Sequence, residues 1–122
     1  MHEIQHMSEL EKIRLRISQF AADRDWDQFH SPKNLSMALA AESGELLEQF
    51  QWLTEEQSKN LNSEKLHSIE EELADIQIYL IRLADKLNIN LIDAVHNKIE
   101  VNERKYPADK VKGSAKKYDE YK

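Results

Sequence analysis

Apolar residues recur at intervals of three and four along most of the chain, which is the spacing that places side chains on one face of a helix. The first periodic segment predicts a helix over residues 4–22, with an apolar face formed by Leu10, Ile13, Ile17 and Phe20. A second helix is predicted to begin at Ser31-Pro32, because a serine hydroxyl caps a helix and proline is tolerated in the first turn. We expect this helix to reach about Trp52.

The longest periodic segment predicts a third helix. A polar stretch over residues 54–62 separates it from the second helix, and Ser63 precedes it. Its apolar stripe consists of Leu66, Ile69, Leu73, Ile76, Leu80, Leu83 and Leu87. The pattern breaks at residues 88–90, where Asn90 is a suitable N-cap for a fourth helix. That helix should end near Pro107, because the residue before a proline avoids helical geometry.

These elements predict an all-α, four-helix bundle-like fold in a single domain over residues 1–107. The remaining residues, 108–122, are rich in lysine and lack periodicity, so we expect a basic and flexible C-terminal tail. A chain of 122 residues is the size of one domain. With two glycines, two prolines and no cysteine, the sequence excludes disulfide scaffolds, thiolate zinc sites and most turn-rich all-β architectures.

The charge balance narrows the class of partner. The formal net charge is -6 and 33% of the residues are charged, so the surface repels phosphate backbones and nucleic-acid polymers are not expected as partners. No stretch approaches the roughly 20 apolar residues that span a bilayer, and the first residues lack the pattern of a secretory signal. We therefore expect no membrane contact and a cytoplasmic, reducing location.

A carboxylate interrupts the apolar stripe of the second helix. Glu42 occupies a position that the periodicity assigns to the core, and burial of an unpaired carboxylate is costly. Glu45 follows one turn later on nearly the same face, and Gly44 between them leaves space for a neighbouring helix or a ligand. The apolar positions around these acids are Leu35, Leu39, Leu46 and Phe50.

The third helix repeats this arrangement, because Glu72, Asp75 and Tyr79 lie along one flank of its apolar stripe. If the two helices are antiparallel, Glu42, Glu45, Glu72 and Asp75 come together, and like charges at that range repel unless a cation lies among them. Oxygen ligands without cysteine favour Mg2+, with Mn2+ as a second possibility. A solvated acidic face is the alternative interpretation of each pair.

A di-iron bundle is a further alternative, because Glu64-x-x-His67 has the spacing of its acid and histidine ligands. The fit is poor, since this pair lies about two turns before Glu72. The second motif that such a site requires is also missing, because Asp93-x-x-His96 matches it only in part. We therefore interpret His67 and His96 as surface residues.

The fourth helix and the aromatic residues supply other binding chemistry. Lys98, Asn102 and Lys105 share one face, followed by Tyr106, and such a stripe suits phosphate oxygens, although a solvated polar face has the same spacing. Aromatic residues gather at the two ends of the second helix and can stack on a nucleobase or anchor the core: Trp26, Phe29, His30 and Trp52.

In this order, the motifs resemble those of the all-α nucleoside triphosphate pyrophosphohydrolases of the MazG type, and most closely the dCTP pyrophosphatase branch. The resemblance runs from about Phe20 to Tyr118. The segments that carry it are 24–30, 32–35, 42–46, 50–52, 71–80, 98–107 and 113–118.

The resemblance implies a role for each of these groups. It implies that Glu42, Glu45, Glu72 and Asp75 bind Mg2+. It further implies that the base and sugar pocket is shaped by Trp26, His30, Trp52 and Tyr79. The phosphates would be held by Lys98, Asn102 and Lys105, with Tyr106 beside them.

It also implies hydrolysis of a deoxynucleoside triphosphate, with dCTP or a modified dCTP favoured, to the monophosphate and pyrophosphate in a homodimer or homotetramer. Such an enzyme removes excess or damaged nucleotides from the pool. We predict Glu45 as the residue that orients or deprotonates water. The lysines of the tail would close over the triphosphate. A non-catalytic helical module that binds nucleotide or a protein is the alternative.

Overall fold

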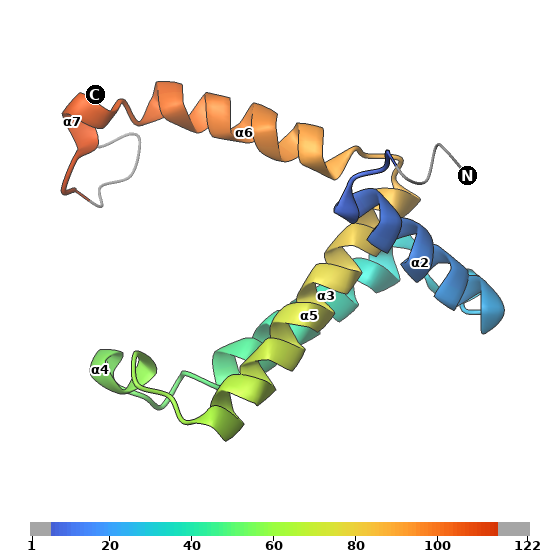
Figure 1. Cartoon of the computed structure of the whole chain (residues 1–122), viewed down its shortest axis with the longest axis horizontal. Coiled ribbons are helices and arrows are strands. Elements are labelled where there is room, and N and C mark those ends of the chain that lie inside the picture. The colour runs from blue at the N-terminus through green and yellow to red at the C-terminus, as the bar shows by residue number, and fades with distance from the viewer. Residues whose placement is uncertain (1–5, 115–122) are drawn as a thin grey trace. The chain divides into compact units, whose positions relative to one another are not determined.

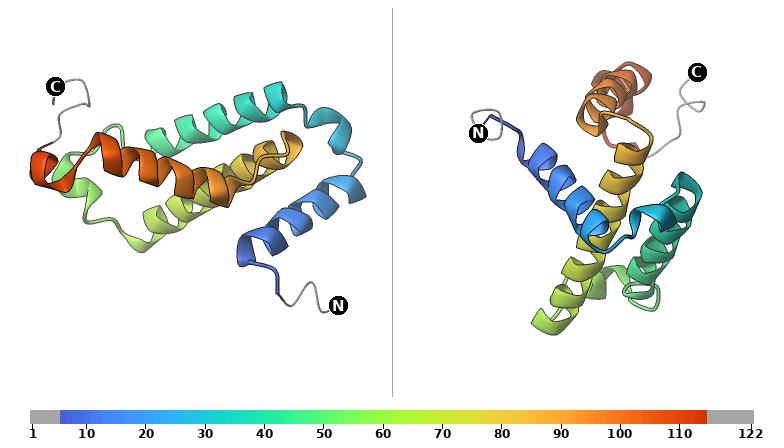
Figure 2. Two further views of the ribbon diagram at one scale, coloured as in Figure 1. Left: turned by 90° about the horizontal axis from the view of Figure 1, so that it is seen from above. Right: turned by 90° about the vertical axis from the view of Figure 1, so that its right-hand side faces the viewer.

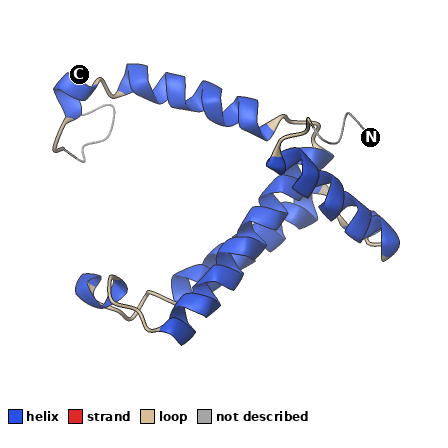
Figure 3. Cartoon of the chain, in the orientation of Figure 1, coloured by secondary structure: helices blue, strands red, loops and turns tan. Residues whose placement is uncertain are grey.

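The computed structural model describes residues 6–114, and this part of the chain contains helices and no strand (Figure 3). The all-α prediction is therefore confirmed. The elements in chain order are α2 (Glu9–Asp23), the 3-10 turn η1 (Asp27–Phe29), α3 (Pro32–Glu48), α4 (Glu55–Ser58), α5 (Ser63–Lys86), α6 (Leu91–Lys105) and α7 (Ala108–Val111). None of the described helices is long and apolar enough to cross a membrane.

Side-chain caps determine where most of these helices begin. Ser31 accepts a hydrogen bond from the Asn34 backbone N–H at the start of α3, and Asn90 caps α6 in the same way, as predicted. Ser8 caps α2, so this helix begins at Glu9 and not at residue 4. Asn62 caps α5.

The connection between α3 and α5 differs from the prediction. The α3 helix ends at Glu48, short of Trp52, and the chain continues in turns. The segment expected to be a polar linker contains the short helix α4, which begins with a capping box between Thr54 and Gln57. At the far end of α5, Asn88 has φ 55°, a left-handed conformation that asparagine tolerates and that terminates a helix.

The chain forms two compact units, Met1–Asn88 and Ile89–Lys122. In the first unit, α3 and α5 lie antiparallel and side by side, and α2 packs against α5 near the end of that pair (Figures 1 and 2). The buried apolar residues are Ala21, Leu35, Ile69, Ile81 and Ala84. The helix α6 and the short helix α7 belong to the second unit.

Apolar residues on the predicted stripes are only partly covered within the chain. Leu73 lies on the predicted stripe of α5 but is 52% exposed, whereas Ile81 and Ala84, outside that stripe, are buried. Leu47 on α3 is 61% exposed. The reason is that the contacts of α5 with α3 and α2, and not the periodicity alone, decide which side chains are buried.

Candidate functional site

The antiparallel packing of α3 and α5 brings three acidic side chains together. Glu42 and Glu45 on α3 and Glu72 on α5 each offer a carboxylate oxygen, and these oxygens lie within 4.8 Å of one another. We call these three residues the acidic cluster. Asp75, one turn after Glu72 on α5, is not one of these three residues, but its charge still acts on Glu42.

Two carboxylate oxygens of the acidic cluster have no hydrogen-bond donor among the described residues. Glu42 Oε2 and Glu72 Oε2 are buried, and no side chain or backbone group of residues 6–114 donates a hydrogen bond to either oxygen. The pKa of Glu42 is raised to about 7, first because its protonated form can share a hydrogen bond with Glu72, then because of burial and of the charge on Glu45. Glu42 therefore exchanges its proton close to neutral pH, where a cation can take the place of that proton.

These carboxylate oxygens are suitable ligands for a hard divalent cation. Buried carboxylate oxygens without hydrogen bonds are costly, and coordination to a metal removes that cost. Carboxylates are the ligands that Mg2+ and Mn2+ prefer. Gly44, which was expected to admit a close neighbour, faces open space among the described residues, because a Cβ added there would meet none of their atoms within 4 Å.

A small hollow lies beside α5 and is bordered by aromatic rings. Phe20 and Trp26 meet edge to face with centroids 5.7 Å apart, and Trp26 and His30 meet at 6.4 Å. The hollow measures about 220 Å³, smaller than a site for a drug-sized ligand and suited to a single planar base. We call it the aromatic hollow; its lining is Ile17, Phe20, Ala21, Trp26, His30, Asp75, Ile78, Tyr79 and Arg82.

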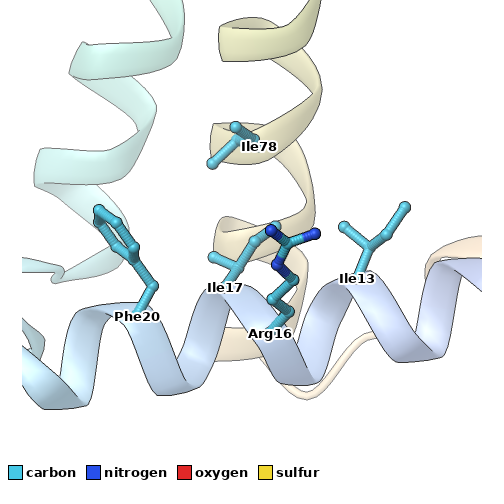
Figure 4. A pocket seen from close by; sticks show the side chains of 5 residues that line it. All are labelled: Ile13, Arg16, Ile17, Phe20 and Ile78. Atoms are coloured by element: carbon cyan, nitrogen blue, oxygen red, sulfur yellow. The ribbon is translucent and has the colours of Figure 1, made fainter.

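A larger groove of about 390 Å³ adjoins the aromatic hollow. Figure 4 shows Ile13, Arg16, Ile17 and Phe20 of α2 directed toward the side of α5 that carries Ile78. The groove shares Ile17, Phe20 and Ile78 with the hollow, but it contains no acid or nucleophile. Of the two, only the aromatic hollow is lined by an acid, Asp75, and by a histidine, His30.

Arg82 is a residue of this site that sequence reasoning missed. Its side chain is only 4% exposed, and it donates from Nη2 to Asp27 Oδ1 at 2.6 Å and from Nε to His30 Nδ1 at 3.2 Å. Lys86 also donates to Asp27. A signal was present, because a charged residue stands inside the apolar run Leu80-Ile81-Arg82-Leu83. Its partner Asp27 lies within the segment 24–30 that carries the family resemblance, but the sequence pattern indicated no role for Asp27.

The direction of the pKa shift is the same but its cause differs between His30 and Asp27, two of the partners of Arg82. Burial, followed by the charges of Arg82 and Lys86, lowers the pKa of His30, so that the imidazole is neutral at neutral pH. Lys86 and then Arg82 lower the pKa of Asp27, which remains ionised.

The other predicted site residues belong to other elements of the chain. Trp52 is 86% exposed beyond the C-terminal end of α3, whereas Trp26 and His30 precede its N-terminal end. Lys98, Asn102 and Lys105 lie on α6 in the second unit, and Tyr106 caps that helix.

The structure also bears on the di-iron alternative. His67 is exposed and lies 3.2 Å from Glu71, away from the acidic cluster, and His96 is also exposed. Both are surface residues, as predicted. No histidine of residues 6–114 belongs to the acidic cluster.

The fold and the acidic cluster define an all-α protein with a carboxylate site between two antiparallel helices. Residues 37–121 match the sequence profile of the MazG-like family, and the chain belongs to this family. In structure it is similar to a pyrophosphatase from Archaeoglobus fulgidus, with a TM-score of 0.79 and 40% sequence identity over 84% of this chain and 95% of that one.

Relatives of known activity are similar in sequence. The chain is 43% identical over 113 residues to dCTP pyrophosphatase 1 from Homo sapiens and 45% identical over 111 residues to the Bos taurus protein. These alignments cover 91% and 89% of this chain but 66% of each relative. The chain therefore spans slightly less than two thirds of the length of these relatives.

Proposed function

We propose that the protein is a Mg2+-dependent pyrophosphohydrolase that converts a deoxynucleoside triphosphate to the monophosphate and pyrophosphate, with dCTP or a modified dCTP as the preferred substrate. The observation that carries this proposal is the acidic cluster, whose buried oxygens on Glu42 and Glu72 lack donors. The similarity to dCTP pyrophosphatase 1 supports the choice of substrate. The role would be removal of unwanted nucleotides from the pool.

Glu42, Glu45 and Glu72 would hold the metal, and Asp75, whose charge acts on Glu42, would be a fourth ligand. A bound Mg2+ would neutralise phosphate oxygens and lower the pKa of a water molecule. Glu45 is the exposed member of the cluster, so it has the access to solvent that a residue orienting or deprotonating water requires. We assign that role to Glu45.

Binding of the substrate would be divided between two groups of residues. The aromatic hollow, with Trp26, His30 and Tyr79, would take the base. Lys98, Asn102 and Lys105 on α6 would contact phosphates, because they share one helix face. The lysines of the predicted tail would add charge; Lys110 lies in the short helix α7 and Lys112 is its C-cap, whereas Lys116 and Lys117 lie outside the described residues.

We further propose a homodimer or homotetramer. The length of α3 separates Trp52 from the aromatic hollow of the same chain, so a role for Trp52 at the base requires a second copy. The half-exposed Leu47, Leu73 and Met37 provide apolar surface for such a contact. Sedimentation at micromolar concentration tests this proposal, and a compact monomer would refute it.

The activity test is release of pyrophosphate from a panel of ribo- and deoxynucleoside triphosphates with Mg2+. The expected result is the fastest release from dCTP or a modified dCTP, and loss of release with a chelator or in Glu45→Gln. Glu48→Gln is the matched control, because Glu48 ends the same helix and is not one of the three cluster residues. Nucleotide binding without any release would instead favour a non-catalytic binding module.

A further inference from the structure

We propose that Arg82 is a positioning residue that holds His30 as the tautomer with its proton on Nε2, so that the aromatic hollow presents a hydrogen-bond donor to the base. The hollow would then select bases that place an acceptor, a keto oxygen or an unprotonated ring nitrogen, against His30. The identity of the ligand rests on the proposed function, whereas the state of His30 does not.

The direction of one hydrogen bond carries the tautomer assignment. Arg82 Nε lies 3.2 Å from His30 Nδ1, and the nitrogens of a guanidinium group can only donate. Nδ1 must therefore be the acceptor and carry no proton. In a neutral imidazole one nitrogen is protonated, so the proton of His30 is on Nε2.

The guanidinium group of Arg82 is anchored by acids on both sides. Asp27 Oδ1 accepts from its Nη2 at 2.6 Å, and Asp85 lies 3.7 Å from its Nη1. Asp85 is in turn paired with Arg14 at 3.0 Å, which ties α2 to α5. Since the Arg82 side chain is 4% exposed, its position follows from these partners and from packing. It is a fixed donor.

The same network fixes the backbone of His30. The His30 N–H donates to the Asp27 carbonyl at 3.1 Å, and the Asp27 side chain binds Arg82. The backbone and one ring nitrogen of His30 are thus both connected to Arg82, one through Asp27 and one directly. The ring cannot exchange its two nitrogens without breaking the bond from Arg82.

The remaining polar atom of the imidazole is the Nε2–H group. His30 lines the aromatic hollow beside Trp26, together with the polar side chains of Asp75, Tyr79 and Arg82. A donor in such surroundings favours a ligand acceptor and penalises a ligand donor, because a buried polar group without a partner is costly. Burial and the cations Arg82 and Lys86 lower the pKa of His30, which keeps the ring neutral through the neutral pH range.

The first test is the 15N NMR spectrum of the histidine side chains of the full chain without nucleotide. In the unsubstituted protein at neutral pH we expect His30 to show an unprotonated Nδ1 and a protonated Nε2, its signals being identified by their loss in His30→Gln. In Arg82→Lys we expect a mixture of tautomers, because lysine keeps the charge but lacks the Nε–H group. Protonated Nδ1 in the unsubstituted protein would overturn the proposal.

Lys86→Met is the matched control. Lys86 donates to the same Asp27 carboxylate as Arg82 but makes no hydrogen bond to His30. We therefore expect the tautomer of His30 to persist in Lys86→Met. If the control loses the tautomer as fully as Arg82→Lys, general electrostatics and not the bond from Arg82 fixes His30, and the proposal fails.

The second test is selectivity among bases. The measured quantity is the ratio of kcat/KM for the best of the four deoxynucleoside triphosphates to kcat/KM for the worst. We expect Arg82→Lys to lower this ratio at least about tenfold, mainly through changes in KM. An unchanged ratio in a variant that has lost the tautomer would refute the selectivity. If no triphosphate is hydrolysed, the proposed function fails, but the NMR test still decides the tautomer of His30. In that case, calorimetry compares the affinities of the four deoxynucleoside monophosphates and decides the selectivity among bases.

Discussion

Two charged groups on α5 are built in opposite ways. The acidic cluster around Glu72 contains only carboxylates, and two of its buried oxygens have no donor among the described residues. In the network around Arg82, cations and acids alternate, and Arg82, Asp27 and Lys86 each have a partner. The difference teaches that unbalanced charge marks a place for a ligand, whereas balanced charge holds the structure in place.

The pKa shifts of the two groups follow this difference. Glu42 in the acidic cluster has a pKa raised to about 7, because acids surround it. The pKa of Asp27 is lowered, because Lys86 and Arg82 bind it. A bound metal cation would offset the negative charge of the acidic cluster, as Arg82 and Lys86 offset the charge of Asp27.

The largest effect should come from removing a charge of the acidic cluster. We expect Glu72→Gln to lower kcat/KM for the preferred triphosphate at least about 100-fold, since even residues that only orient metal ligands are worth 10–100-fold. The fold should persist, because the change also removes like-charge repulsion. Pyrophosphate release and circular dichroism measure the two outcomes.

Glu71→Gln is the control for that prediction, because Glu71 is exposed and pairs with His67 on the surface. It should retain activity within about twofold. An equal loss of activity in Glu72→Gln and Glu71→Gln would show that activity does not depend on the acidic cluster in particular.

The next effect concerns the balanced network. We expect Arg82→Met to lower the free energy of unfolding by about 1–3 kcal/mol, because it removes a buried donor and leaves Asp85 and His30 short of a partner. Lys86→Met should cost less than about 1 kcal/mol, since its partner Asp27 is largely exposed. Urea denaturation measures both values, and the reverse order would contradict the comparison.

The pH dependence should have opposite signs in the two groups. The folded state holds a proton on Glu42 up to about pH 7, whereas the unfolded chain releases it near 4.5, so the free energy of unfolding falls as pH rises through this window. We expect a fall of about 1–2 kcal/mol without metal. The lowered pKa of Asp27 stabilises the fold above about pH 3.8, and this contribution is lost on further acidification.

Metal should abolish the first of these trends. With saturating Mg2+, the fall in stability between pH 4.5 and 7 should disappear, because the cation offsets the charge of Glu42. Thermal unfolding at a series of pH values, with Mg2+ and with a chelator, measures this. In Glu42→Gln the trend should be absent under both conditions, and its persistence there would assign it to another group.

The smallest effect is expected at the surface. His67→Ala should change the free energy of unfolding by less than about 0.5 kcal/mol and leave activity unchanged, because the pair with Glu71 is solvent-exposed. A loss of metal-dependent activity in this variant would instead support the di-iron interpretation, in which His67 is a metal ligand.

The local features of the fold were largely predictable from the sequence. Periodicity indicated the four long helices, and Ser31 and Asn90 marked two of their beginnings, because capping depends on residues only a few positions apart. Glu42 was recognised for the same reason, as a charge inside an apolar repeat. Spacing alone also aligned Glu42 with Glu45 and Glu72 with Asp75.

Only the tertiary structure decided which of these residues meet. The antiparallel contact of α3 and α5 joins Glu72, and not Asp75, to Glu42 and Glu45 in the acidic cluster, and it leaves Leu73 exposed. The bond from Arg82 to His30 joins residues far apart in the chain, so no local pattern contains it. The physical reason is that helix formation depends on neighbours within one or two turns, whereas burial, hydrogen bonding and pKa depend on which faces pack together.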